Sequence, residues 1–242
     1  MKLLTSFFFL IVFSLCAQES VLYLEEQVQT PGFFGKAGVT NRVESWLTAD
    51  KYRKDEPDQN QSILVRSDLG KIWRIDHSDS SYQEIPAEVF QGMAMMGVMM
   101  FGVTLDSLTG APIIPDPLFV QTTRHRKIGE WQAYEMIPAQ RGEGSMSGMV
   151  KSFIMWVSPD CGISADVYAN ISRKMMGPLS TEYEALFKQM ENLGGYPVLV
   201  ETTMMGKKAK QQLISCKVKE VSSQVFDLPN SYHLVESDLL EY

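Results

Sequence analysis

The chain has 242 residues, with 22 basic and 29 acidic side chains and a formal net charge of −7. An acidic chain without a basic stripe is a poor nucleic-acid binder, so we expect no nucleic-acid partner. Net charge bears on solubility and says little about the fold, which has to come from the pattern of the residues.

Residues 1–17 have the composition of a secretory signal peptide. A positive start at Lys2 is followed by an apolar run, and Cys16 and Ala17 offer small residues for cleavage. The apolar run is shorter than the about 20 residues of a membrane span. We therefore predict that residues 1–17 are a signal peptide.

A signal peptide implies an exported protein, which we expect in the periplasm or at the outer membrane, where it could associate peripherally with the envelope. Residues 18–242 are long enough for one β-rich domain, and we predict a single domain there. Lipidation at Cys16 is an open alternative that the bulky Leu15 before it disfavours. The oligomeric state does not follow from these features.

Two cysteines, Cys161 and Cys216, remain after cleavage at this site. In an oxidising compartment they could form a disulfide that closes a long loop. The alternative is two separate buried thiols, because free cysteine is among the most buried residue types. Their spacing matches no redox or metal motif.

Short segments with alternating apolar and polar residues fill the first third of the chain. They are separated by turns, one of which carries His77 in a solvated position. Many short strands at close spacing predict an antiparallel sheet or barrel. The expected strands cover residues 21–29, 40–48, 62–66, 71–76 and 82–85.

A β-hairpin is predicted near the end of the chain. Residues 198–205 and 209–221 form its arms, and Gly206 begins the turn between them. Gly194 and Gly195 can end the preceding helix, because glycine adopts the left-handed conformation at little cost. We expect ten or eleven antiparallel strands in total, with helices near residues 86–103 and 163–192 against one face.

Residues 89–105 form an uncharged segment rich in methionine and glycine. Flexible methionines and interrupting glycines suit a deformable apolar surface, so we predict that Met93 to Phe101 form a lid over a hydrophobic ligand. Two adjacent phenylalanines between glycines form a second predicted gate. The alternative is that both segments fill the core. The predicted ligand-binding residues are Phe33, Phe34, Met93, Met96, Met99, Met100 and Phe101.

No catalytic motif stands out. The three histidines are scattered, and Met146 occupies the central position of the segment that imitates a nucleophile elbow. We predict no catalytic residue, no metal, no cofactor and no enzymatic activity. Copper binding by methionine sulfur is a weaker alternative, since soft thioethers select Cu(I).

Several segments carry a resemblance to a known family. They include Gly194-Gly195-Tyr196-Pro197-Val198, Trp156-Val157-Ser158-Pro159-Asp160 and the stretch from Ile128 to Glu135. With these segments the chain resembles a family of exported bacterial proteins of unknown function that is related to the LolA/LolB-like lipoprotein-carrier fold. The resemblance implies an α+β, mainly antiparallel structure: a curved, incompletely closed β-barrel with helices covering its concave face. It transfers no catalytic residue.

From the fold expectation and the lid, we predict a non-catalytic protein that binds a hydrophobic ligand such as a lipid or acyl chain. Its partner would be a lipid or an acylated protein. The alternative is an envelope interaction or sensor domain without a small ligand, which would show an exposed apolar patch or edge strand.

Overall fold

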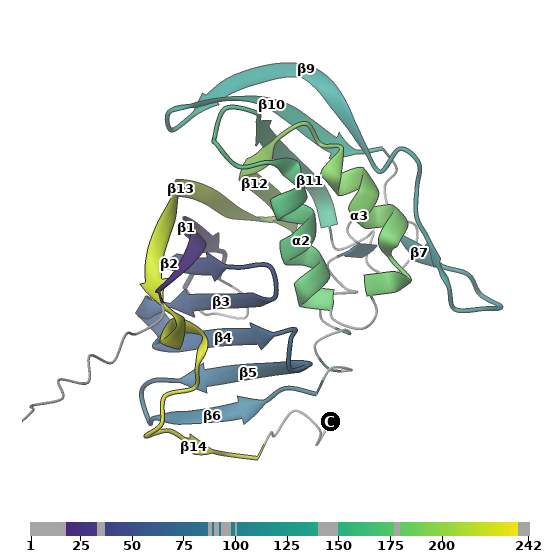
Figure 1. Ribbon diagram of the computed structural model, residues 1–242. Helices are drawn as coiled ribbons and strands as arrows, with labels where there is room; N and C mark the ends of the chain where they lie inside the picture. Colours follow the sequence, from purple (N-terminus) through teal and green to yellow (C-terminus); the bar gives the residue numbers. More distant parts are fainter. Residues whose placement is uncertain are drawn as a thin grey trace, which may run out of the picture.

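The computed structural model in Figure 1 describes residues 18–32, 37–86, 89, 92, 98–99, 101–139, 150–176 and 180–236. The described residues form a 12-stranded sheet, a two-stranded hairpin and two α-helices. The predicted signal peptide lies outside them. The first strands of the chain are β1 (Gln18–Thr30), β2 (Val39–Leu47), β3 (Lys51–Glu56), β4 (Gln61–Arg66), β5 (Lys71–Asp76) and β6 (Ser81–Glu84).

The second half of the sheet is built from later strands. The small hairpin consists of β7 (Thr104–Leu105) and β8 (Pro112–Ile113). The helices α2 (Ala165–Met176) and α3 (Glu184–Glu191) lie between two strands of the large sheet in the sequence. The remaining strands are β9 (Phe119–Ile128), β10 (Trp131–Pro138), β11 (Val150–Ser158), β12 (Tyr196–Met204), β13 (Lys207–Ser222) and β14 (His233–Leu234).

The large sheet has the strand order β14-β6-β5-β4-β3-β2-β1-β13-β12-β11-β10-β9. It is curved and not closed, with β14 and β9 at its two ends, and α2 lies inside the curve (Figure 1). The predicted class, an α+β fold with a mainly antiparallel, incompletely closed sheet, is confirmed.

The predicted strand number and orientation were not fully right. The large sheet has twelve strands, and β14 runs parallel to β6. The two-residue strands β7 and β8 are too short to show an alternating pattern in the sequence, so the prediction missed both.

The predicted C-terminal hairpin is confirmed as the pair β12 and β13. Its turn consists of Met205 and Gly206, which have φ angles of 50° and 77°. Two consecutive left-handed residues give the twist that matches the flanking strands, and glycine adopts this conformation without strain. The turn begins one residue earlier than predicted, because Met204 already pairs with Lys207.

One row of apolar side chains crosses the concave face of β2 to β5. Leu47, Tyr52, Val65 and Ile72 are successive partners in the strand registers. Because side chains alternate between the faces of a strand, partners across a sheet lie on the same face. All four side chains are buried and belong to one apolar cluster, which includes Leu24 and Val198.

The opposite face of this half of the sheet is covered by the segment that follows β13. The short 3-10 helix η3 (Ser223–Phe226) places Phe226 against Leu64 and Ile75, and all three side chains are fully buried. Arg53 fixes η3 by donating a 2.8 Å hydrogen bond to the carbonyl oxygen of Val225. The outer face is therefore closed by the chain itself.

His77 fixes the same C-terminal segment further along. Its Nε2 lies 2.6 Å from the hydroxyl of Ser62, and its Nδ1 lies 2.9 Å from the hydroxyl of Tyr232. The predicted turn is present, but the side chain is half-buried and bridges β4 to the segment before β14. The expectation of a solvated position was wrong, since sequence alone could not place Tyr232 beside it.

Helix α2 packs on α3 and on strands of the second half of the sheet. Its Ala165, Ala169 and Met176 are buried in an apolar cluster with Phe187 and Met190 of α3. Val167, Ile171 and Met175 contact the other cluster, the one on the concave face, and are only half-buried. The helix is thus tightly packed on one side and loosely packed on the other.

Candidate ligand-binding site

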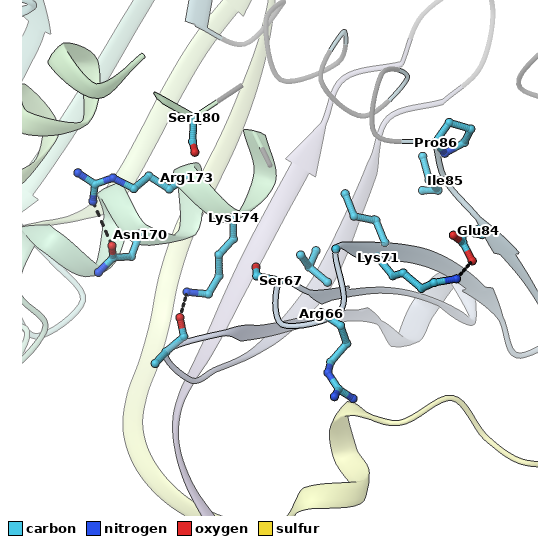
Figure 2. Close-up of a pocket in the computed structure, with 14 residues that line it drawn as sticks. Arg66, Ser67, Lys71, Glu84, Ile85, Pro86, Asn170, Arg173, Lys174 and Ser180 are labelled. Atoms are coloured by element: carbon cyan, nitrogen blue, oxygen red, sulfur yellow. Dashed lines mark hydrogen bonds and ion pairs between the residues drawn. The ribbon is translucent and has the colours of Figure 1, made fainter. Parts of the chain in front are cut away.

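A cavity of about 510 Å³ lies between the concave face of the sheet and α2 (Figure 2). We call it the groove. Its sheet side is formed by the ends of β4, β5 and β6, and its helix side by the last turns of α2. Its described lining residues are Ala49, Val65, Arg66, Ser67, Gly70, Lys71, Ile72, Glu84, Ile85, Pro86, Asn170, Arg173, Lys174 and Ser180.

The wall on the sheet side is apolar. Val65 and Ile72 are register partners on neighbouring strands, and Ile85 follows β6, where its backbone N–H donates to the Ile72 carbonyl. Pro86 extends this wall beyond the sheet. The apolar wall exists because branched aliphatic side chains, Val65 and Ile72, occupy the concave-facing positions at the ends of β4 and β5 that border the groove.

The rim of the groove is charged, and most of its charges are paired. Lys71 contacts Glu84 at 2.7 Å. Arg66 contacts Asp68 at 2.6 Å and donates to the Phe226 carbonyl, so its guanidinium is turned toward η3 (Figure 2). Lys71 and Glu84 join the neighbouring ends of β5 and β6, while Arg66 and Asp68 pair at the turn that follows β4.

A buried carboxyl group also faces the concave side. Glu26 of β1 is 8% exposed and accepts a 3.0 Å hydrogen bond from the Gln211 side-chain amide. Burial raises the pKa of Glu26, against the opposing effects of Gln211 and the charge of Lys54. A carboxyl group in this environment favours its neutral form.

The charge of Glu26 affects the pKa values of three tyrosines. Burial raises the pKa of Tyr52, of Tyr168, which reaches about 12, and of Tyr196, and the Glu26 charge adds to each rise. The rings of Tyr168 and Tyr196 meet edge to face, with their centroids 6.0 Å apart. The concave interior therefore carries tyrosine hydroxyls and one carboxyl group whose pKa values are raised by burial in an apolar surrounding.

Most of the predicted ligand-binding residues lie outside the described residues. These are Phe33, Phe34, Met93, Met96 and Met100. Of the other two, Phe101 is buried and its ring centroid lies 4.8 Å from that of Phe153 and 5.3 Å from that of Phe119, while Met99 is half-buried. Neither Met99 nor Phe101 lines the groove, and the predicted lid stays a prediction.

The two cysteines are brought together. Cys161 lies in the turn after β11 and Cys216 in β13, and the thiol of Cys216 is 2.9 Å from the carbonyl oxygen of Cys161. Both are free thiols in this structure, and burial raises the pKa of each. The predicted disulfide stays a prediction.

The described residues contain no group of three histidine, cysteine, aspartate or glutamate side chains that could hold a metal ion. In the same part of the chain, no helix combines the length and the apolar character needed to cross a membrane.

The prediction missed the groove itself and Glu26. The groove forms where β4 to β6 meet α2, and α2 follows β6 by some eighty residues in the sequence. The signal that could have indicated Glu26 is a charged residue on the inward parity of a strand otherwise occupied by Leu22 and Leu24.

No family model matches the chain, and no curated protein matches it. Among solved structures, PNGF-II in a C2 crystal form is similar with a TM-score of 0.38 and 13% identity, over 93% of this chain and 32% of that one. This chain therefore spans about a third of the length of PNGF-II.

A second solved structure is a Vibrio parahaemolyticus domain assigned to outer membrane lipoprotein sorting. It has a TM-score of 0.33 and 10% identity, over 86% of this chain and 89% of that one. Similarities at this level carry no argument about what this chain does.

Proposed function

We propose that this protein binds an apolar ligand, such as a lipid or acyl chain, in the groove between the concave face of the sheet and α2. The observation that carries the proposal is the apolar wall of Val65, Ile72 and Ile85, which lines a cavity of about 510 Å³. Ligand sites are concave, mostly apolar and typically ~300–1,000 Å³ in volume.

The packing of α2 supports the same proposal. Val167, Ile171 and Met175 pack against the concave cluster but remain half-buried, so apolar surface on the helix side of the interior is left incompletely covered. An apolar ligand would bury this surface, at about 25 cal/mol for each square ångström removed from water. We also propose that the protein is exported and that it carries lipids or acylated proteins.

The alternatives have less support. Copper binding by methionine would use Met93, Met96 and Met100, which lie outside the described residues, with Met175-Met176 and Met204-Met205 as possible further ligands. An interaction domain would use the β7–β8 hairpin, where Leu108 is 93% exposed. We place the proposed ligand site in the groove because the ends of three strands and a helix form its walls.

The test is titration with a fluorescent fatty acid and a variant that blocks the groove. Ser67 is exposed and lines the groove, so Ser67→Trp should fill its mouth without disturbing the core. We expect saturable binding by the unaltered protein and at least a tenfold weaker affinity in Ser67→Trp. Ser107→Trp, an equivalent change at an exposed serine next to the β7–β8 hairpin, is the matched control and should bind normally.

Two results would contradict the proposal: no saturable binding by the unaltered protein, or equal binding by Ser67→Trp and Ser107→Trp. Mass spectrometry of organic extracts from natively purified protein gives an independent measurement. It identifies a co-purifying lipid without a choice of probe.

A further inference from the structure

The groove has two chemically different ends. In Figure 2, Ile85 and Pro86 lie at the sheet end, while Asn170, Lys174 and Ser180 lie at the helix end. At the sheet end, the apolar surface of Ile85 and Pro86 lies beside Lys71 and Glu84, which are paired with each other, and the helix end carries further groups with hydrogen-bond donors. A ligand matched to both ends would be an amphiphile, and this inference rests on the proposed function of the groove.

The cations of the rim differ in their partners. Lys71 and Arg66 are paired with carboxylates, as described above. Arg173 is paired as well, with Glu191 at 2.7 Å and Glu184 at 3.1 Å. Each of these charges is satisfied by the protein and has little to gain from a ligand.

Among the described residues that line the groove, Lys174 is the cation that forms no ion pair with a carboxylate. Its ammonium donates a 2.8 Å hydrogen bond to the carbonyl oxygen of Ala49, a neutral group. No carboxylate of the described residues forms an ion pair with it, and Asp50 acts on it only through its charge. The side chain is half-buried, and this burial lowers the pKa of Lys174 more than the Asp50 charge raises it.

An ammonium group has three donors, and the Ala49 carbonyl uses one. A partly desolvated cation without a counter-ion is unfavourable, and an anion beside it would restore the lost solvation. Hydrogen bonds between charged groups are about twice as strong as neutral ones. The groove thus offers an anion-binding group at one end of an apolar wall.

We propose that the ligand of the groove is a single-chain amphiphile whose anionic headgroup, a carboxylate or a phosphate, binds Lys174 while its chain lies along Val65, Ile72 and Ile85. Lys174 then selects anionic over neutral lipids of the same chain length. The apolar wall provides affinity, and the ammonium provides headgroup specificity.

The experiment is displacement of a fluorescent fatty acid methyl ester, a neutral probe, by three amphiphiles of equal chain length. These are a fatty acid, a lysophosphatidic acid and a neutral monoacylglycerol. We expect at least one anion to displace the probe at about tenfold lower concentration than the monoacylglycerol, as a charged hydrogen bond of about 1.5 kcal/mol predicts. The more effective anion identifies the headgroup as carboxylate or phosphate.

Three variants decide the role of Lys174. Lys174→Gln should remove the advantage of the anions and leave the affinity for the methyl ester within about twofold of the unaltered protein. Lys174→Arg should keep the advantage. Lys127→Gln removes an exposed positive charge from β9, at the other end of the sheet order, and is the matched control that should change nothing.

The inference is overturned if the monoacylglycerol competes as well as both anions, or if Lys174→Gln keeps the preference. In either case the methyl ester still binds, and the proposed function of the groove stands. If the methyl ester itself shows no saturable binding, the proposed function fails and this inference fails with it.

Discussion

Helix α2 has two sides, and they are packed to different degrees. Toward α3 and strands β10 to β12, its Ala165, Ala169 and Met176 are fully buried. Toward the apolar cluster on the concave face, its Val167 and Ile171 are half-buried. The first side fixes the position of the helix, and the second leaves space, so a rigid support and an open site come from one element.

The largest expected effect is on the tightly packed side. Phe187 of α3 is completely buried in the cluster with α2, and Arg173 lies 4.9 Å from its ring centroid. Phe187→Ala should lower the free energy of unfolding by about 3–5 kcal/mol, the cost of a large cavity in a core. Urea unfolding followed by tryptophan fluorescence measures it. Phe187→Leu, with a smaller loss, keeps the comparison measurable if the alanine variant does not fold.

A disulfide would strengthen the attachment of α2 further. Cys161 precedes the helix by four residues, and a bond to Cys216 would tie this end to β13. Protein purified from an oxidising compartment should then lose about 2–4 kcal/mol of stability on reduction, and Cys161→Ser with Cys216→Ser should show the same loss. Titration of two free thiols in the denatured, unreduced protein would exclude the bond.

On the open side, Glu26 gives a stability that depends on pH. Its folded-state pKa is raised above the ordinary value of 4.5, so the folded protein holds the proton more tightly than the unfolded chain. The stability that protonated Glu26 contributes is therefore fully present below about pH 4.5, and it is lost as the pH rises through the raised folded-state pKa.

Glu26→Gln should remove this decrease and raise the free energy of unfolding at about pH 8 by on the order of 1 kcal/mol. The new amide still offers an acceptor to Gln211. Denaturation curves between about pH 4 and pH 8 test this, with Glu130→Gln at an exposed turn as control. Parallel curves for Glu26→Gln and the unaltered protein would show that Glu26 is not desolvated.

The smallest effect is expected at the half-buried side chains of α2. Ile171→Ala should cost about 0.5–1 kcal/mol, below the ~2–5 kcal/mol of a filled core site, because water already reaches part of the side chain. The same urea titration measures it beside Phe187→Ala. Equal losses for the two variants would mean that both sides of α2 are packed alike.

The local elements of the fold could be predicted from the sequence. The hairpin of β12 and β13 follows from Gly206 and the alternation after it, and the breaks at Gly194 and Gly195 separate α3 from β12. Gly194 has a φ angle of 76°, and a side chain at Gly195 would collide with the backbone of Ser158. The left-handed turns at Gly194 and Gly206 act between neighbours in the sequence and leave a visible pattern, whereas the collision at Gly195 depends on a distant strand.

The site could not be predicted in the same way. Lys174 lies in an amphipathic helix where a lysine is ordinary, and its role depends on Ala49, which is 125 residues away. Glu26 is buried because β1 pairs with β2 and β13 on its two sides, and its partner Leu213 comes from the other end of the chain. Register between distant strands decides these environments, and short alternating segments fit many registers equally well.

The position of β1 also determines how the chain must fold. In the sheet β1 lies between β2 and β13, and Gln18 pairs with Ser222. Contacts between such distant residues form slowly, because a long loop must close before they contribute any energy. Among the described strands, the two halves of the sheet are joined through the pair β1 and β13, so the complete sheet cannot form until β13 has left the ribosome. Until then one edge of β1 is unpaired. Such an edge can pair with another chain, so the incomplete chain must be protected from aggregation.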